Sequence, residues 1–141
     1  MTKGIIAILI RAFSNQKAKD ILIKLGDWFI ELIRPLSDEQ IQNILKTEHG
    51  GINESFADLY SITKNKKYLE TAEKLSQKAI LDPLIKKEDK LTGLHANTQI
   101  PKVIGFEKIG IKKGSRFSLL AYPKALYCQA ELVSASMNNH S

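Results

Sequence analysis

The sequence is short of cysteine and has no long apolar run. Its 141 residues include one cysteine, Cys128, which excludes an internal disulfide framework and any cysteine-rich metal site. No segment approaches the roughly 18 apolar residues that a membrane-spanning helix requires, so we predict no membrane partner. The apolar run near the N-terminus stops at Arg11, and no small-residue cleavage site follows it. There is thus no convincing signal peptide, and the compartment stays unknown.

Familiar nucleotide-binding, redox and hydrolase motifs are also absent. The sequence contains no G-x-G-x-x-G, P-loop, C-x-x-C, H-E-x-x-H or G-x-S-x-G pattern, and no strand-like alternation of any length. The net charge of +6 arises from 21 basic and 15 acidic residues. The lysines are scattered along the chain beside acids, which is typical of a solvated surface, so we predict no nucleic-acid partner.

What the chain does have is helical periodicity. Apolar residues between positions 17 and 34 recur on one face of a helix, and Pro35 ends that helix. Ser37 and Gln40 have the spacing of a capping box, which predicts a short second helix through Leu45.

Two further helices are expected at about 53–63 and 67–80, with Asn65 as a left-handed turn residue between them. The second should bury four residues along one face: Tyr68, Ala72, Leu75 and Ala79. Aromatic residues at helical spacing are expected in the core rather than on a sugar-stacking platform: Trp28, Phe29, Phe56, Tyr60 and Tyr68.

Two prolines shape the rest of the prediction. Asp82 and Pro83 are expected to end the helix at 67–80 and to open a long loop, 82–97. The last helix is expected at about 98–109, with Pro101 tolerated because it would lie in the first turn.

A weak internal repeat favours an all-helical fold. Residues 14–25 resemble residues 63–75, and Asn15 and Asn65 stand 50 residues apart. A third turn-like site, Ser115, lies another 50 residues on. Such a period is typical of stacked helical hairpins, which bury their apolar faces only against neighbours. The chain holds too few hairpins to close a helical toroid.

Two short polar motifs stand out, EHGGINE at 48–54 and LHANTQIPK at 94–102. Each places a histidine and an asparagine just before an amphipathic helical run. The histidines, His49 and His95, are 46 residues apart, close to the length of one hairpin with its loops. We therefore expect the two motifs to line one rim of the same pocket.

The chemistry of these motifs suits hydroxyl-rich ligands. Imidazole, amide and carboxylate groups can donate to or accept from neutral sugars. The candidate residues are His49, Asn53, Glu54, His95, Asn97 and Gln99. The alternative is that His49, Asn53, Asn97 and Thr98 are simply helix caps. Spacing alone makes no catalytic pair of Glu48 and Glu54, and the three histidines are too spread for a metal site.

The strings EHGGINESFADLYSITKNKKYLETAEKLSQKAILDPL and DKLTGLHANTQIPKVIGFEKIG closely resemble glycoside hydrolase family 127, the β-L-arabinofuranosidase-like enzymes. The resemblance covers about residues 15–110 and implies part of an (α/α)6 toroid. It implies that His49 and His95 contact the sugar, and that Asn53, Glu54, Asn97 and Gln99 lie in or behind the pocket. The implied partner is therefore a carbohydrate of the arabinofuranoside type.

The resemblance also implies a zinc-bound cysteine nucleophile and a glutamate acid/base, which lie C-terminal to the matched stretch in the family. Nothing in this sequence corresponds to them, and Cys128 lacks the neighbouring pattern. We therefore assign no catalytic residue, no metal ligand and no cofactor to this chain.

The expected organisation is a partial catalytic domain over residues 1–110 and a non-matching tail over 111–141, either frameshifted or disordered. The expected function is a glycoside hydrolase fragment that contributes part of a sugar pocket and is inactive alone. The alternatives are a non-enzymatic helical-repeat interaction module and a pseudogene product.

Overall fold

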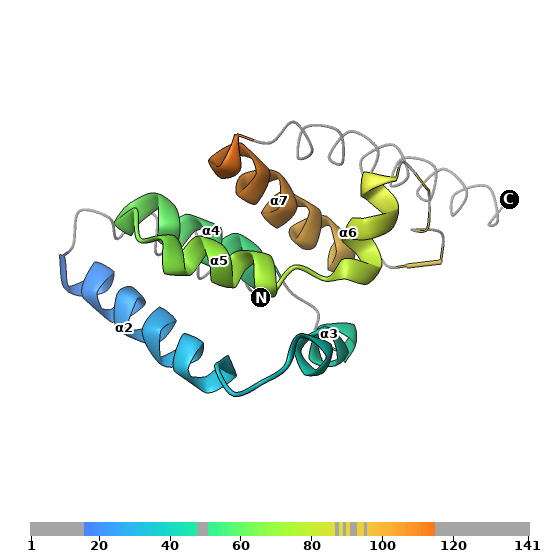
Figure 1. The fold of residues 1–141 in the computed structure, drawn as a ribbon. Coiled ribbons are helices and arrows are strands. Elements are labelled where there is room, and N and C mark those ends of the chain that lie inside the picture. The colour runs from blue at the N-terminus through green and yellow to red at the C-terminus, as the bar shows by residue number, and fades with distance from the viewer. Residues whose placement is uncertain are drawn as a thin grey trace, which may run out of the picture.

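The computed structural model describes residues 16–47, 51–86, 88, 90, 93–94 and 96–114. All regular structure in that part of the chain is helical, which confirms the predicted all-α class. The helices are α2 (Gln16–Ile33), α3 (Asp38–Thr47), α4 (Ile52–Thr63), α5 (Lys66–Lys74), α6 (Lys78–Ile85) and α7 (Ala96–Lys113) (Figure 1). Within the same residues no helix is both long and apolar enough to cross a membrane.

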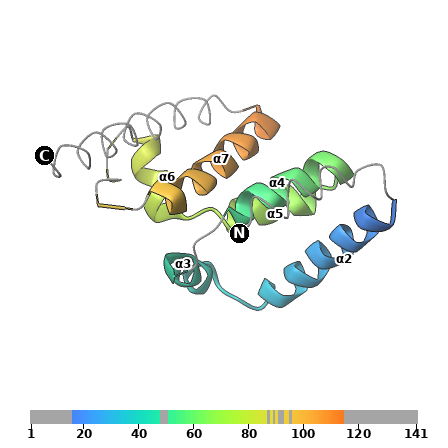
Figure 2. The same ribbon diagram turned by 180° about the vertical axis from the view of Figure 1, so that it is seen from behind.

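Helix α4 lies at the centre of the arrangement. It forms an antiparallel hairpin with α5 and packs along its other side against α7. Helix α2 lies on the far side of this hairpin, and α6 packs against the start of α7. The view from behind in Figure 2 shows the same order, with α2 parallel to α5 and α4 parallel to α7. This alternation is that of stacked hairpins, and whether it belongs to a toroid stays a prediction.

Most of the apolar core surrounds α4. The larger cluster consists of Ile33, Ile41, Leu45, Phe56, Ala57, Leu59, Tyr68, Ala72, Leu75 and Ile109. A smaller cluster joins α6 to α7 through Ile80, Leu84, Val103 and Phe106. Each large apolar side chain buried in this way contributes roughly 1.5–3 kcal/mol, so the packing on α4 is the main source of stability.

The start of α3 confirms the predicted capping box. The backbone N–H of Ser37 donates to Oε1 of Gln40 at 2.8 Å, and the N–H of Gln40 donates to Oγ of Ser37 at 3.2 Å. Two amides that the first helical turn leaves without partners are satisfied in this way.

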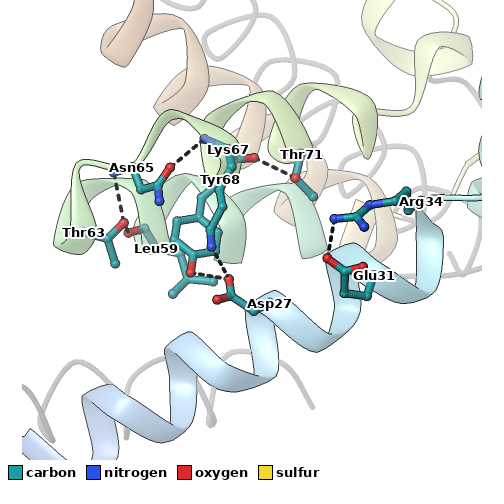
Figure 3. A network of polar contacts seen from close by, with 9 residues as sticks. All are labelled: Asp27, Glu31, Arg34, Leu59, Thr63, Asn65, Lys67, Tyr68 and Thr71. Carbon is teal, nitrogen blue, oxygen red and sulfur yellow. Dashed lines mark hydrogen bonds and ion pairs between the residues drawn. The ribbon is translucent and has the colours of Figure 1, made fainter.

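The turn between α4 and α5 differs from the prediction. Lys64, and not Asn65, has the left-handed backbone, with φ of 58°. Asn65 is extended and caps α5, because its side chain accepts from the N–H of Lys67 at 3.2 Å (Figure 3). The prediction for Asn65 is wrong because the chain enters a new helix there, and an asparagine side chain serves better as a cap.

The predicted helix at 67–80 is interrupted earlier than expected. α5 ends at Lys74, α6 begins at Lys78, and Ala79 is exposed. The side chain of Gln42 on α3 explains the break, since it donates to the carbonyl of Ser76 at 3.0 Å and accepts from the N–H of Lys78 at 2.8 Å. A side chain 34 residues away in sequence thus replaces the helical partners of this turn.

Both prolines lie further inside helices than predicted. Pro83 is within α6 and does not end it, so the loop expected from residue 82 begins only after Ile85. α7 begins at Ala96, which places Pro101 beyond the first turn. In each case the carbonyl left without its helical partner belongs to an exposed residue, Ala79 or Asn97. Water can hydrate those carbonyls, which lowers the cost of an internal proline.

The aromatic residues are only partly where the sequence placed them. Phe56 and Tyr68 are buried, and Phe29 packs beside Phe56 with ring centroids 5.5 Å apart. Tyr60 is half-buried against the same cluster. Trp28 is 59% exposed, so its predicted place in the core is wrong. The core-facing positions of α2 are instead taken by Gly26 and Ile33.

A polar network fixes α2 to α5. The hydroxyl of Tyr68 donates to Asp27 at 2.6 Å, and Nζ of Lys67 lies 2.7 Å from the same carboxylate (Figure 3). Hydrogen bonds from Lys67 and Tyr68 hold the pKa of the Asp27 carboxyl below its usual value. The contact links two helices that no short loop connects.

Several predictions fall outside the described residues. They concern His49, His95, Cys128 and the greater part of the tail expected over 111–141. The proposed division at residue 110 stays a prediction, although α7 itself continues through Lys113.

Candidate functional site

The starts of α4 and α7 lie against each other. A Cβ placed on Gly51 would lie 3.0 Å from Cβ of Pro101 and 3.1 Å from its carbonyl oxygen. Only a residue without a side chain allows this approach without displacement. Because Gly51 belongs to the first polar motif and Pro101 to the second, the structure brings the described parts of both motifs together.

Asn53 joins the two helices from within. It is 2% exposed, its Nδ2 donates to the carbonyl of Lys102 at 3.0 Å, and its Oδ1 accepts from the N–H of Glu54 at 2.9 Å. Its amide lies over Gly105, where an added Cβ would stand 2.4 Å from three atoms of that amide. Asn53 therefore holds α4 against α7, and its side chain is not the N-cap of α4, since Gly51 occupies that position.

Glu54 belongs to a charged cluster between the same helices. Nζ of Lys108 on α7 lies 2.9 Å from Glu54 and 2.7 Å from Asp58, both on α4. Burial opposes the charge on Lys108, but hydrogen bonds to Asp58 and Glu54 outweigh it and raise the pKa of the ammonium. Lys108 and Asp58 are 50 residues apart, which is the period of the repeat.

Gln99 lies in a second polar group at the start of α7. Nζ of Lys102, a residue that is 5% exposed, donates to Gln77 at 2.6 Å and to Gln99 at 3.4 Å. The side-chain amide of Gln99 donates to Oγ1 of Thr98 at 2.8 Å. Burial among these neutral groups lowers the pKa of the Lys102 ammonium. Gln99 is thus oriented by its neighbours on both sides.

Asn97 is the one remaining candidate that the structure describes. Asn97 is exposed in the first turn of α7. His49 and His95 lie outside the described residues, two positions before Gly51 and one before Ala96 in the sequence. Because α7 starts at Ala96, Asn97 and Thr98 are helical residues rather than caps.

Sequence reasoning missed Lys102, Lys108 and Asp58. Lys102 stands inside the LHANTQIPK motif, where its charge had no assigned partner. Asp58 and Lys108 differ by one period of the repeat, and an opposite-charge pair at that spacing was the signal available. None of these groups forms a metal site: the described ranges contain no set of three or more His, Cys, Asp or Glu side chains able to hold an ion.

Over the described residues the fold is all-helical, and the described parts of the two polar motifs meet near the starts of α4 and α7. The profile of the GH127 catalytic domain of β-L-arabinofuranosidases matches residues 3–123. The chain therefore belongs to the GH127 β-L-arabinofuranosidase-like family, as the resemblance over 15–110 indicated, and the match extends past that stretch at both ends. No curated protein matches the chain.

Proposed function

We propose that this chain supplies part of the sugar-binding pocket of a β-L-arabinofuranosidase-like glycoside hydrolase. Membership of the family supports a carbohydrate substrate. The observation that carries the proposal is the contact of Gly51 with Pro101, because it sets the two motifs side by side. The two polar loops that lead into α4 and α7 can then surround one ligand.

The candidate residues divide into two roles. His49, His95, Asn97 and Gln99 bind sugar hydroxyls, since imidazole and amide groups offer donors and acceptors to a neutral ligand. Asn53 and Glu54 hold α4 against α7 through Lys102 and Lys108 and so position the binding groups.

The chain by itself is expected to bind without turnover, because it holds no counterpart of the family's nucleophile and acid/base segment. An assay with an aryl β-L-arabinofuranoside, with and without added zinc, tests this. Turnover that His49→Ala abolishes would show that the catalytic groups are present after all.

Binding is tested separately by recording amide ¹H–¹⁵N spectra of the full chain during titration with methyl β-L-arabinofuranoside. Saturable shifts are expected at the starts of α4 and α7. His49→Ala and His95→Ala should each weaken binding by up to about tenfold, because a hydrogen bond to a neutral hydroxyl contributes about 0.5–1.5 kcal/mol.

His140→Ala is the matched control, since it removes the third histidine, which stands outside both motifs. The control should bind like the parent chain. Shifts that are absent, or that neither motif variant changes, would reject the proposed pocket.

A further inference from the structure

Helix α2 carries a row of exposed apolar side chains. Ile21, Leu25, Trp28 and Leu32 are 66%, 56%, 59% and 54% exposed. Their spacing of four, three and four residues places them in one narrow line along a helix. Four large apolar residues in an unbroken row differ from the single exposed apolar residues that any surface contains.

The row lies roughly 120° around α2 from the buried Gly26 and Ile33, beside the part of the helix that meets the core. Gly26 and Ile33 are the buried residues of this helix, and Leu22, Ile23 and Ile30 pack beside the core cluster. The apolar arc of α2 is therefore wider than its contact with the core. A helix with this pattern normally has a second neighbour over the uncovered part.

The charges beside the row indicate what that neighbour is. Lys24 and Glu31 are exposed and flank the row along the same edge, one helical heptad apart. If a second α2 is laid antiparallel over the row, about the midpoint between Leu25 and Trp28, each Lys24 comes within about two residues, or about 3 Å along the axis, of the Glu31 of the other copy, a gap that a lysine side chain can span. Glu31 also pairs with Arg34, the residue directly after α2 (Figure 3), an exposed contact that such a partner can replace at little cost.

The apolar side chains are self-complementary in the same arrangement. Ile21 of one copy faces Leu32 of the other, and Leu25 faces Trp28, so large residues meet along the whole row. We propose that a second copy of this chain covers the row, with the two α2 helices antiparallel across a two-fold axis. A closed, isologous pair of this kind is the commonest form of oligomer.

The contact is small, and the dimer is correspondingly weak. One helix face per copy falls below about 1,200 Å² of total buried surface, the range of transient association. We expect a Kd on the order of 10–100 µM.

The test is sedimentation of the full chain between about 5 and about 500 µM, the span that brackets this affinity. Mass should rise from monomer to dimer and stop there. Trp28 is the single tryptophan of the chain, so its emission should shift to shorter wavelength over the same concentrations. The two readouts together report which face is covered.

Trp28→Glu should leave the chain monomeric throughout this range. Ile44→Glu is the matched control, because Ile44 is an apolar residue 50% exposed on α3, away from the row. Lys24→Glu and Glu31→Lys should each weaken the dimer at least threefold, and the double exchange should restore it. Since all these side chains are exposed, far-ultraviolet circular dichroism should show an unchanged fold.

Three results would overturn the proposal. The first is a monomer with invariant tryptophan emission at every concentration, which would leave the row to a different partner. The second is a dimer that persists in Trp28→Glu. The third is growth beyond the dimer, which would mean that the contact is not closed by a two-fold axis.

Discussion

Gly105→Ala should destabilise the chain, and removing the side chain of Asn53 should cancel that effect. The new Cβ would stand 2.4 Å from the Asn53 amide, which two hydrogen bonds hold in place. Overpacking of this kind typically costs about 1–3 kcal/mol. The higher helix propensity of alanine offsets about 1 kcal/mol of that cost.

Asn53→Ala removes both hydrogen bonds and part of a buried side chain, so a loss of about 2–3 kcal/mol is expected. In that background Gly105→Ala meets no amide, and only the gain in helix propensity of about 1 kcal/mol remains. The double variant should therefore be more stable than Asn53→Ala alone. The resulting coupling is about 2 kcal/mol, well above the scatter of about 0.5 kcal/mol expected for independent sites.

Urea unfolding followed by circular dichroism measures all four members of this cycle. Thermal midpoints should shift in the same order, by about 2–4 °C for each kcal/mol, the range for chains near 150 residues. Asn43→Ala, at an exposed asparagine on α3, is the control and should add to Gly105→Ala without coupling. Additive effects of Asn53→Ala and Gly105→Ala would mean that the amide does not fill the space over Gly105.

Two further predictions concern charge. Lys108→Met should cost about 1–3 kcal/mol at neutral pH, because it removes charge-assisted hydrogen bonds and leaves Glu54 and Asp58 facing each other. Because the folded pKa of Lys108 is raised, its contribution to the free energy of unfolding is complete below about pH 10.5 and is lost as the pH rises through the folded pKa. If urea unfolding shows the same difference between Lys108→Met and the parent throughout that pH range, the assignment is wrong. Asp27→Asn should destabilise the chain at neutral pH, because Tyr68 and Lys67 lose a charged partner. Because the folded pKa of Asp27 is lowered, its contribution to the free energy of unfolding is complete above about pH 3.8 and is lost as the pH falls through the folded pKa. The unfolding free energies of Asp27→Asn and the parent should therefore converge in acid. A difference that stays constant with pH would refute the assignment.

Local signals explain which parts of the fold were predictable. The capping box of Ser37 and Gln40 involves residues three apart, and both of its hydrogen bonds are present. The break between α5 and α6 was not predictable, because it depends on Gln42, a residue of another helix. Trp28 was misplaced because the apolar arc of α2 is wider than its core contact, and periodicity does not say which part of the arc meets the core.

The same distinction applies to the candidate site. The two motifs were visible as strings, and the repeat implied that their helices are neighbours. The different structural roles of the residues within each motif were not visible in the sequence. The sequence shows Asn53 and Asn97 as similar polar residues near helix starts, yet one is buried between helices and the other is exposed. Burial of this kind depends on the facing surface, here Gly105, 52 positions further along the chain.

The packing of the Asn53 amide over Gly105 also fixes the axial register of α4 against α7. Sliding α4 by one helical turn, about 5.4 Å, would move the buried amide away from the glycine and against Pro101 or Ile109. The amide would then be left without its acceptor in an apolar contact, at a cost of about 1–3 kcal/mol. A purely apolar seam has no such preference among neighbouring alignments. One asparagine thus keeps the ends of two helices level, as single buried asparagines do in coiled coils.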